Sequence, residues 1–586
     1  MALEKATGKI VAAQGNLMTV EFTGIIRQNE LVYVKTGGQS LKGEVIEING
    51  NLAKVQVFEP TRGVRYGDLV EFDEELLSVE LGPGLLKSIY DGLQNPLEDV
   101  AKEAGYFLPR GMYLTPLDRE KKWSFTPMVK VGDPVERASY IGWVPEGVIE
   151  HKIMVPFRFQ GKGTIVEIKD AGEYTIDDEI AKIKDENGNV QSITMAQKWP
   201  SKFPLRFGKR RYPDQPIITG SRIIDGPFPV AKGGTFCTPG PFGAGKTVLQ
   251  HQISKNAEAQ VVIVVACGER AGEVVEILRE FPLLDDPQTG KKLIDRTCII
   301  CNTSSMPVAA RESSVYVGTT IGEYYRQMGL DTLLLADSTS RWAQALREMS
   351  GRLEEIPGEE AFPAYLSSRI AEFYERAGLI ENVMGDIGSL TMGGAVSPAG
   401  GNFEEPVTQS TLAVVGCFLG LSRSRSDARR FPAIDPLISW SKYFDRFGET
   451  GDDDLKKKVK IIHKAQTVLK ESDEIGKKMS VVGEEGISLE DIVVFLKGEF
   501  YDSVFLQQNA FDKVDTTCDV NRQLELAEVV GTVIDTKFKF NTRDDARKFF
   551  VDLSNQVIQW NYTAKGDPDY KVQKNAILEQ VRGEKE

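Results

Sequence analysis

The stretch GPFGAGKT, Gly240 to Thr247, decides the fold of the region around it. It fits the P-loop pattern, in which glycines let the backbone wrap closely around phosphates. The helix expected to start near Thr247 adds its positive N-terminal end to such a loop. Lys246 should neutralise the β- and γ-phosphates, and Thr247 should bind Mg²⁺. The residues expected to surround the nucleotide are Gly240, Pro241, Phe242, Gly243, Ala244, Gly245, Lys246, Thr247 and Val248.

Apolar runs follow the loop and alternate with helical patterns. The runs are VVIVVAC (261–267), CIIC (298–301) and TLLLAD (332–337). Such continuous runs predict strands buried on both faces, and hence a mostly parallel sheet with helices on each side. Ligands of open parallel sheets bind at the carboxyl ends of the strands. This rule predicts that Glu269, just after the first run, and Asp337, at the end of the third, face the phosphates.

These positions suggest chemical roles for three residues. Asp337 suits the second protein partner of Mg²⁺. Glu269 could orient and deprotonate a water molecule, and its neighbour Arg270 could hold negative charge that develops on the γ-phosphoryl group. Two simpler interpretations stay open. Asp337 could face solvent at a strand end, and Glu269 could be a helix N-terminal glutamate favoured by the helix dipole.

The rest of the chain divides by pattern into further domains. Short strands split by Gly-Asn pairs predict a small β-barrel over residues 1–73. Residues 74–105 contain Gly and Pro at intervals, and we predict that they form a crossover segment that joins the nucleotide-binding domain. Residues 106–200 are β-rich, 201–440 form the P-loop domain, and 441–586 read as helices under a charged face.

Composition and single residues narrow the possible functions. The 586 residues carry a net charge of −14, which argues against wholesale binding to nucleic acid or anionic lipid. No apolar stretch reaches the ~18 residues of a membrane span, and MALEKATGKI lacks the apolar core of a secretory signal. We interpret CIIC as a buried strand, and Lys152 in HKIMVP as a strand residue rather than the lysine of a swinging-arm carrier. The three histidines form no ligand cluster, so any metal should be hard and oxygen-bound, such as Mg²⁺.

Four segments, in order, resemble the catalytic A subunits of V/A-type rotary ATPases: GPFGAGKT, CGERAGEVVE, ADSTSRWAQALRE and RFPAIDPLISWS. The resemblance covers nearly the whole chain, and the β-rich segment ahead of the P-loop is typical of this family. It implies a multidomain α/β fold with an N-terminal β-barrel, a β-rich bulge insert, a RecA-like P-loop parallel-sheet nucleotide-binding domain and a C-terminal α-helical domain.

The resemblance also implies roles at matching positions. Lys246 and Thr247 match the phosphate and Mg²⁺ residues, Glu269 the water-activating glutamate, and Arg270 the arginine beside it. Glu273 matches an acidic residue that steadies Mg²⁺-bound water. Phe431 matches an aromatic residue that packs on adenine, and QQNAFD (507–512) lies near the nucleotide in that family. Many eukaryotic members carry cysteine where this loop has Ala244, so Cys518 lacks that partner and a loop disulfide is not expected.

The implied function is ATP hydrolysis or synthesis in a rotary motor that transports H⁺ or Na⁺. ATP and ADP, with Mg²⁺, are the expected ligands. The expected partners are a non-catalytic B-type subunit, which alternates with this chain in a hexameric ring, and the central rotor and peripheral stalk subunits. The chain is expected on the cytoplasmic side of a membrane, without direct insertion into it. No nucleic-acid partner is expected. Two alternatives remain: a ring-shaped nucleic-acid translocase, which should show an aromatic, basic binding surface, and a non-catalytic nucleotide-binding member of such a ring.

Overall fold

The computed structural model describes residues 5–105 and 109–584, in two compact units. One unit comprises Met1–Tyr212, Ala259–Val396 and Glu404–Val414, and the other comprises Pro213–Glu258, Ser397–Phe403 and Val415–Glu586. The boundary predicted at residue 106 falls on residues 106–108, outside the described residues. The predicted domain limits therefore remain predictions, although the type of structure in each can be described.

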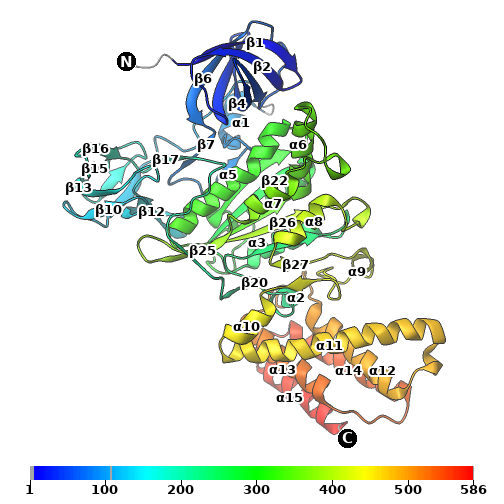
Figure 1. Ribbon diagram of the computed structural model, residues 1–586. Helices are drawn as coiled ribbons and strands as arrows, with labels where there is room; N and C mark the ends of the chain where they lie inside the picture. The colour runs from blue at the N-terminus through cyan, green and yellow to red at the C-terminus, as the bar shows by residue number, and fades with distance from the viewer. Residues whose placement is uncertain (1–4, 106–108, 585–586) are drawn as a thin grey trace. The chain divides into compact units, whose positions relative to one another are not determined.

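The first unit begins with a closed barrel of six strands (Figure 1). The strands are β1 (Thr7–Gln14), β2 (Leu17–Thr23), β3 (Glu30–Thr36), β4 (Gln39–Asn49), β5 (Leu52–Val57) and β6 (Leu69–Leu76). Their order around the barrel is β1-β2-β5-β4-β3-β6, and β6 pairs with β1 to close it. Gly15 and Gly50 take positive φ in the tight turns after β1 and β4, as the Gly-Asn pairs predict. Small and β-branched side chains such as Val20, Val34 and Val55 fill the interior.

The β-rich segment forms two antiparallel four-stranded sheets. One has the order β10 (Pro134–Glu136), β13 (Lys162–Ile168), β15 (Ala181–Asp185), β16 (Val190–Ile193). The other has the order β12 (Ile149–Met154), β11 (Tyr140–Glu146), β9 (Trp123–Pro127), β14 (Gly172–Tyr174). A further strand, β17 (Gln197–Pro200), returns to pair with β7 (Ser78–Leu81) of the crossover segment.

A buried polar network fixes this segment to helix α5 (Val308–Gln327). The His151 ring is fully buried, with Nδ1 2.6 Å from Glu146 Oε2 and Nε2 2.9 Å from the Tyr324 hydroxyl. Tyr325 donates a hydrogen bond to the same Glu146 oxygen, and the Gly84 amide donates to the other. These hydrogen bonds join β11 and β12 to the crossover and to α5. They also provide the partners that buried polar side chains require.

The core of the first unit is a parallel sheet with strand order β26-β24-β22-β23-β8. The strands are β26 (Ile387–Val396), β24 (Asp331–Asp337), β22 (Val261–Glu269), β23 (Thr297–Thr303) and β8 (Ile89–Tyr90). At the β26 edge, β25 (Gly378–Glu381) runs antiparallel and pairs in turn with β18 (Lys209–Arg211). The helices of this part are α1 (Leu97–Ala104), α4 (Ala271–Glu280), α5, α6 (Thr339–Arg352), α7 (Leu366–Tyr374) and α8 (Pro406–Val414).

Two glycines let α5 lie close to this sheet. A Cβ at Gly318 would approach Val265 to 2.4 Å, and one at Gly322 would approach Leu390 to 2.8 Å. Because the two positions are four residues apart, they share one face of the helix. Helix α5 is buried along nearly its whole length, polar residues included, because it packs against this sheet and also against α6 and β7.

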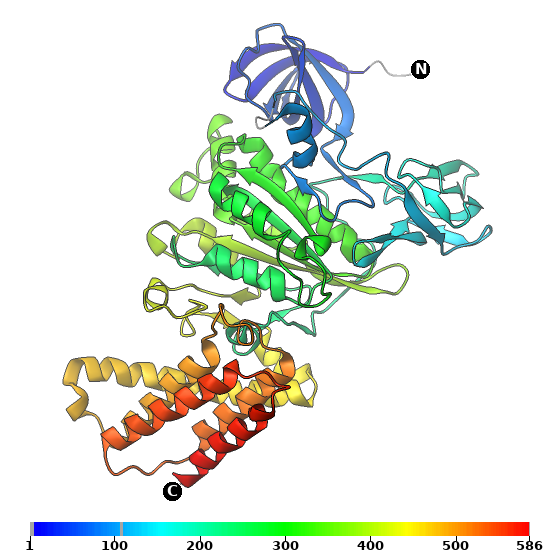
Figure 2. The ribbon, with the colours of Figure 1, turned by 180° about the vertical axis from the view of Figure 1, so that it is seen from behind.

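The second unit contains the P-loop segment and the C-terminal helices. Its short strands are β19 (Pro216–Ile217), β20 (Val230–Ala231), β21 (Thr235–Pro239), β27 (Cys417–Phe418) and β28 (Trp440–Ser441), with β27 parallel to β21 and antiparallel to β28. Its helices are α2 (Arg222–Asp225), α3 (Lys246–Asn256), α9 (Arg423–Asp427), α10 (Phe444–Thr450), α11 (Asp453–Val482), α12 (Leu489–Tyr501), α13 (Val520–Asp535), α14 (Arg543–Tyr562) and α15 (Pro568–Gly583). Figure 2 shows the last three in orange and red. Asp452 caps α11, because its side chain accepts a hydrogen bond from the Leu455 amide.

The predicted fold class is confirmed by the barrel, the parallel core sheet and the helical C-terminal region. Two details differ. Strand β22 extends through Glu269 instead of ending at Cys267, and the crossover supplies a strand of its own, β8, to the edge of the core sheet. A two-residue strand leaves no periodicity in a sequence, so this pairing could not be predicted.

Candidate functional site

The P-loop joins β21 directly to α3 within the second unit. Gly243 and Gly245 take φ of 79° and 84°, a left-handed conformation that side chains with a Cβ rarely adopt. Gly245 is the N-cap of α3, so the loop runs directly into the N-terminus of that helix. Gly240 is needed for another reason, because a Cβ there would lie 2.8 Å from the Leu421 Cβ. The geometry is that of an anion cradle.

Lys246 is held inside this loop. Its side chain is 9% exposed, and its ammonium donates hydrogen bonds to the carbonyls of Gly240 (2.8 Å) and Pro241 (2.9 Å). Thr247 is half-buried beside it, whereas Phe242 and Val248 are exposed. The loop therefore concentrates one positive charge and several backbone donors in one place.

A second segment of this unit attaches to the region of Phe431. The Gln508 amide donates to the Phe431 carbonyl at 2.8 Å, and the Gln508 side chain accepts from the Arg222 amide and donates to the Gly220 and Asp515 carbonyls. Arg222 and Asp515 form a buried ion pair under this segment. Helix α3 joins in, because Gln252 donates to the Thr516 carbonyl at 3.1 Å. Phe431 and residues 507–518 thus belong to one hydrogen-bonded structure.

The first unit brings the predicted acidic residues together at the carboxyl ends of two neighbouring strands. In the parallel pairing of β22 and β24, Ala266 lies opposite Asp337, three residues before Glu269. Glu273 lies in the first turn of α4, which begins directly after Glu269 and has Arg270 as its N-cap residue. Asp337 is buried, and Glu269 and Glu273 are half-buried. The predicted gathering of acidic side chains at this edge is present in the structure.

This crowding changes the acidity of Glu269. Burial, the negative charge of Asp337 and a hydrogen bond shared with Glu273 raise the pKa of Glu269 to about 8. A buried carboxyl group beside other carboxylates holds its proton more tightly because ionisation would add a like charge in a poorly solvated place. Strongly shifted carboxyl groups of this kind are typical of functional sites.

Two arginines that the sequence did not single out lie against Gly268, the residue before Glu269. Gly268 takes φ of +73°, and a Cβ there would lie 2.8 Å from the Arg341 Cβ and 3.0 Å from the Arg311 Cδ. The Arg311 guanidinium donates to the Ser304 carbonyl at 2.9 Å. Arg341 could have been suspected from its place four residues after Asp337, but no sequence signal connects Arg311, on another helix, to Glu269.

The donor set suits Mg²⁺ brought by a nucleotide. Across residues 5–105 and 109–584, no three His, Cys, Asp or Glu side chains make a complete metal-binding cluster. Mg²⁺ characteristically uses one or two carboxylates together with waters and substrate phosphates. The first unit offers the carboxylates of Asp337 and Glu273, and the second unit offers the Thr247 hydroxyl; each is an oxygen donor of a kind that Mg²⁺ accepts.

The structure also places other residues that the sequence analysis considered. CIIC lies in β23, where Cys298 and Cys301 are buried, and all six cysteines, each within the described residues, are buried and free. Lys152 lies inside β12, opposite Trp143, and pairs with Glu150, so it is a strand residue as predicted. Ala244 and Cys518 are both buried. Among the described residues, no helix combines the length and apolar character needed to cross a bilayer.

Comparison with known proteins covers almost every part of the chain. Family models match residues 10–73 (ATP synthase alpha/beta family, beta-barrel domain), 114–202 (barrel-sandwich domain of the ATPsynthase alpha/beta subunit), 220–441 (ATP synthase alpha/beta family, nucleotide-binding domain) and 457–548 (C-terminal domain of V and A type ATP synthase).

Proteins named V-type ATP synthase alpha chain align along nearly their whole length. That of Protochlamydia amoebophila is 60% identical over 97% of this chain and 96% of its own, and that of Treponema denticola is 55% identical over 99% and 97%. Among solved structures, the ATPase EscN of the enteropathogenic E. coli type III secretion system matches with a TM-score of 0.62 at 20% identity. The match covers 89% of this chain and 100% of EscN, and it supports the fold alone.

Proposed function

We propose roles for the site residues of this chain, which belongs to the family of V-type ATP synthase alpha chains. As a member, it is a nucleotide-binding catalytic subunit of a V/A-type rotary ATPase, which hydrolyses or makes ATP and binds ATP or ADP. The roles of individual side chains in binding and catalysis have to be assigned separately. The geometry of the two groups of residues described above supports an assignment.

The P-loop residues from Gly240 to Val248 would bind the phosphates. Their backbone amides and the N-terminus of α3 supply donors, and Lys246 supplies the positive charge that the loop holds in place. Mg²⁺, held by Thr247, Asp337 and Glu273, would neutralise charge on the phosphates. Phe431 would pack on adenine, in keeping with its hydrogen bond to the 507–512 segment; Phe511, at the tip of that segment, is fully exposed.

Glu269 would be the general base that takes a proton from the attacking water. The observation that carries this assignment is its half-buried carboxyl group beside Asp337 and Glu273 at the end of β22. A base must be ionised to act, and a pKa near 8 keeps much of Glu269 protonated at neutral pH. Once the charges of Asp337 and Glu273 are compensated, Glu269 would ionise near neutral pH. Arg270, fixed at the N-cap of α4, would steady negative charge on the γ-phosphoryl group.

The test is Glu269→Gln in the assembled complex. We expect nucleotide binding near that of the wild type and turnover lower by about 10²-fold or more, because a positioned general base contributes about 10²–10⁴-fold. Glu276→Gln is the matched control, since Glu276 is an exposed carboxylate on the same helix α4. Turnover within a few-fold of the wild type for Glu269→Gln would remove Glu269 from the mechanism.

The family also suggests the surroundings in which the chain works. We propose that it alternates with a non-catalytic B-type subunit in a hexameric ring, contacts central rotor and peripheral stalk subunits, and acts on the cytoplasmic side of a membrane in H⁺ or Na⁺ transport. The alternatives of a nucleic-acid translocase and of a non-catalytic ring member are not favoured by the relatives. Purification of the intact complex, followed by identification of its subunits with mass spectrometry, tests the proposed partners.

A further inference from the structure

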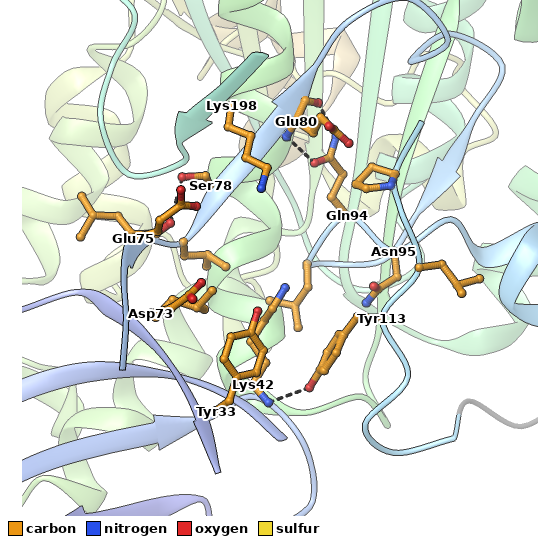
Figure 3. Close-up of a pocket in the computed structure, with 16 residues that line it drawn as sticks. Tyr33, Lys42, Asp73, Glu75, Ser78, Glu80, Gln94, Asn95, Tyr113 and Lys198 are labelled. Carbon is orange, nitrogen blue, oxygen red and sulfur yellow. Dashed lines mark hydrogen bonds between the residues drawn. The ribbon is translucent and has the colours of Figure 1, made fainter. Parts of the chain in front are cut away.

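A small cavity lies at the base of the barrel, far along the chain from the P-loop. It has a volume of about 150 Å³ and is formed by the barrel, β7, β17 and the segment around Tyr113 (Figure 3). Leucines 31, 76, 77, 93 and 114 supply apolar wall. Lys42 from β4 and Lys198 from β17 supply the charged part, and Figure 3 shows both ammonium groups directed into the cavity from opposite sides.

Carboxylates act on Lys42 from a distance, but neither ammonium group directly contacts one among the described residues. Neither makes a hydrogen bond or an ion pair with any residue in 5–105 or 109–584; the Lys42 ammonium lies 4.8 Å from the centre of the Tyr113 ring. Burial lowers the pKa of Lys42, and the positive charge of Lys198 lowers it further, against the opposing effect of several carboxylates. A partly buried ammonium without a charge partner is costly, so this arrangement would gain from an anion.

Most carboxylates near the cavity are already engaged. Glu80 pairs with Arg119, and Asp73 pairs with Lys5 at 3.4 Å. Glu59 accepts a hydrogen bond from the Tyr113 hydroxyl. This leaves Glu75 as the lining carboxylate without a hydrogen-bonding partner among the described residues, against two unpaired ammonium groups. The unpaired charge of the cavity is therefore positive.

We propose that this cavity binds a small oxyanion of the size of inorganic phosphate between Lys42 and Lys198. The cavity volume is larger than the roughly 30 Å³ that one water molecule takes in the liquid, and smaller than the about 300–1,000 Å³ of pockets for larger organic ligands. A small oxyanion suits a volume between these limits. The Tyr33 hydroxyl also lines the cavity and can donate to an oxyanion. Charge-assisted hydrogen bonds from two ammonium groups are among the stronger polar contacts in proteins.

Such an anion would link parts that are distant in sequence. Lys42 belongs to the barrel, and Lys198 lies in the strand that follows the β-rich segment. Because a ligand that binds the folded state alone stabilises it, the contact between the barrel and β17 should become more stable with the logarithm of the phosphate concentration above the Kd. The site is independent of the nucleotide-binding function proposed above.

Equilibrium dialysis with radiolabelled inorganic phosphate tests the proposal on the full chain. The protein is first saturated with Mg²⁺ and the non-hydrolysable analogue AMP-PNP, so that the nucleotide phosphates fill the P-loop. We expect one saturable phosphate site, displaced by sulfate but not by chloride at equal ionic strength. Lys42→Met and Lys198→Met should each weaken binding by about tenfold or more, because each removes a charged hydrogen-bond donor.

Three further variants keep the test decisive. Lys121→Met removes an exposed lysine outside this cavity, whose ammonium lies 4.0 Å from the Trp123 ring centre, and should leave binding unchanged. Lys42→Arg keeps the charge and should stay within a few-fold of the wild type. Lys198→Gln changes an exposed side chain and should weaken binding as Lys198→Met does. The absence of saturable binding, equal displacement by chloride, or unchanged binding in both Met variants and in Lys198→Gln would overturn the proposal.

Discussion

At the scale of single residues, three carboxyl groups at one sheet edge have a measurable consequence before any nucleotide binds. The folded chain raises the pKa of Glu269 to about 8, through burial, Asp337 and Glu273, whereas an unfolded chain leaves a glutamate near its ordinary value of about 4.3. Below that value the group is protonated in both states and contributes no penalty. As pH rises from about 4.3 towards 8, the unfolded chain releases this proton and the folded chain keeps it, so stability is lost over that window.

Glu269→Gln should therefore become more stabilising as pH rises. The difference in thermal midpoint between this variant and the wild type should grow between pH 5 and 8 and level off above about pH 8. Differential scanning fluorimetry of the chain without nucleotide or Mg²⁺ measures it, with Glu276→Gln as control. A difference that is the same at pH 5 and pH 9 would contradict the raised pKa.

A second prediction at the scale of single residues compares two glycines near Glu269, Gly268 and Gly272. Gly268→Ala places a Cβ against Arg341 in a left-handed backbone, which costs about 1–2 kcal/mol before any clash. Gly272→Ala lies in α4 with no atom within 4 Å of the new Cβ, so it should stabilise by about 0.5–1 kcal/mol.

Because Gly268 directly precedes Glu269, turnover of the assembled complex should fall by about 10²-fold in Gly268→Ala and stay near the wild type in Gly272→Ala. Thermal midpoints and ATPase rates of the two variants check this. Equal behaviour of the pair would show that the backbone at Gly268 does not position Glu269.

At the scale of secondary-structure elements, the sequence predicted those elements whose residues follow a regular period or a fixed spacing. Alternating runs predicted the barrel, continuous apolar runs predicted β22, β23 and β24, and the glycine spacing predicted the turn into α3. The rule that ligands bind at the carboxyl ends of parallel strands then predicted that Glu269 and Asp337 face the same ligand. The contact of Arg311 with Gly268 could not be predicted, since nothing local links positions forty residues apart on a helix and a strand. The same holds for the attachment of Gln508 to Phe431.

The segment around Gln508 depends on the buried pair of Arg222 and Asp515. Asp515→Ala leaves the Arg222 guanidinium buried without its counter-charge and removes the acceptor of the Asn509 amide, which lies 2.7 Å from Asp515 Oδ2. Loss of one partner of a buried pair costs about 3–5 kcal/mol. We expect hydrogen exchange at Asn509 and Cys518 to accelerate by about 10²-fold or more, with Lys513→Ala, an exposed change in the same segment, as the control. Unchanged exchange would mean that other contacts hold the segment.

At the scale of the whole molecule, the question is whether one chain carries a complete catalytic site. Phosphoryl transfer gains about 10³–10⁵-fold from an arginine that reaches the γ-phosphate, often from another subunit. Arg270 is fixed as the N-cap of α4 directly after a core strand, so it suits a steady role rather than one that begins on closure. We therefore expect the isolated chain to bind MgATP and to hydrolyse it slowly.

Addition of the proposed partner should restore most of the rate. Titration of the purified B-type subunit into a fixed amount of this chain should give an ATPase rate that rises and saturates near equal stoichiometry, because each interface then gains the arriving arginine. Replacement of the B-type subunit's interface arginine with alanine should abolish the gain in ATPase rate. Size-exclusion chromatography should still show the assembled ring, which would separate a chemical role of this arginine from a role in assembly. An isolated chain that already turns over at the rate of the mixed ring would contradict this expectation. It would mean that the arginine needed for transfer lies within this chain, where Arg311 and Arg341 beside Gly268 are the first to test.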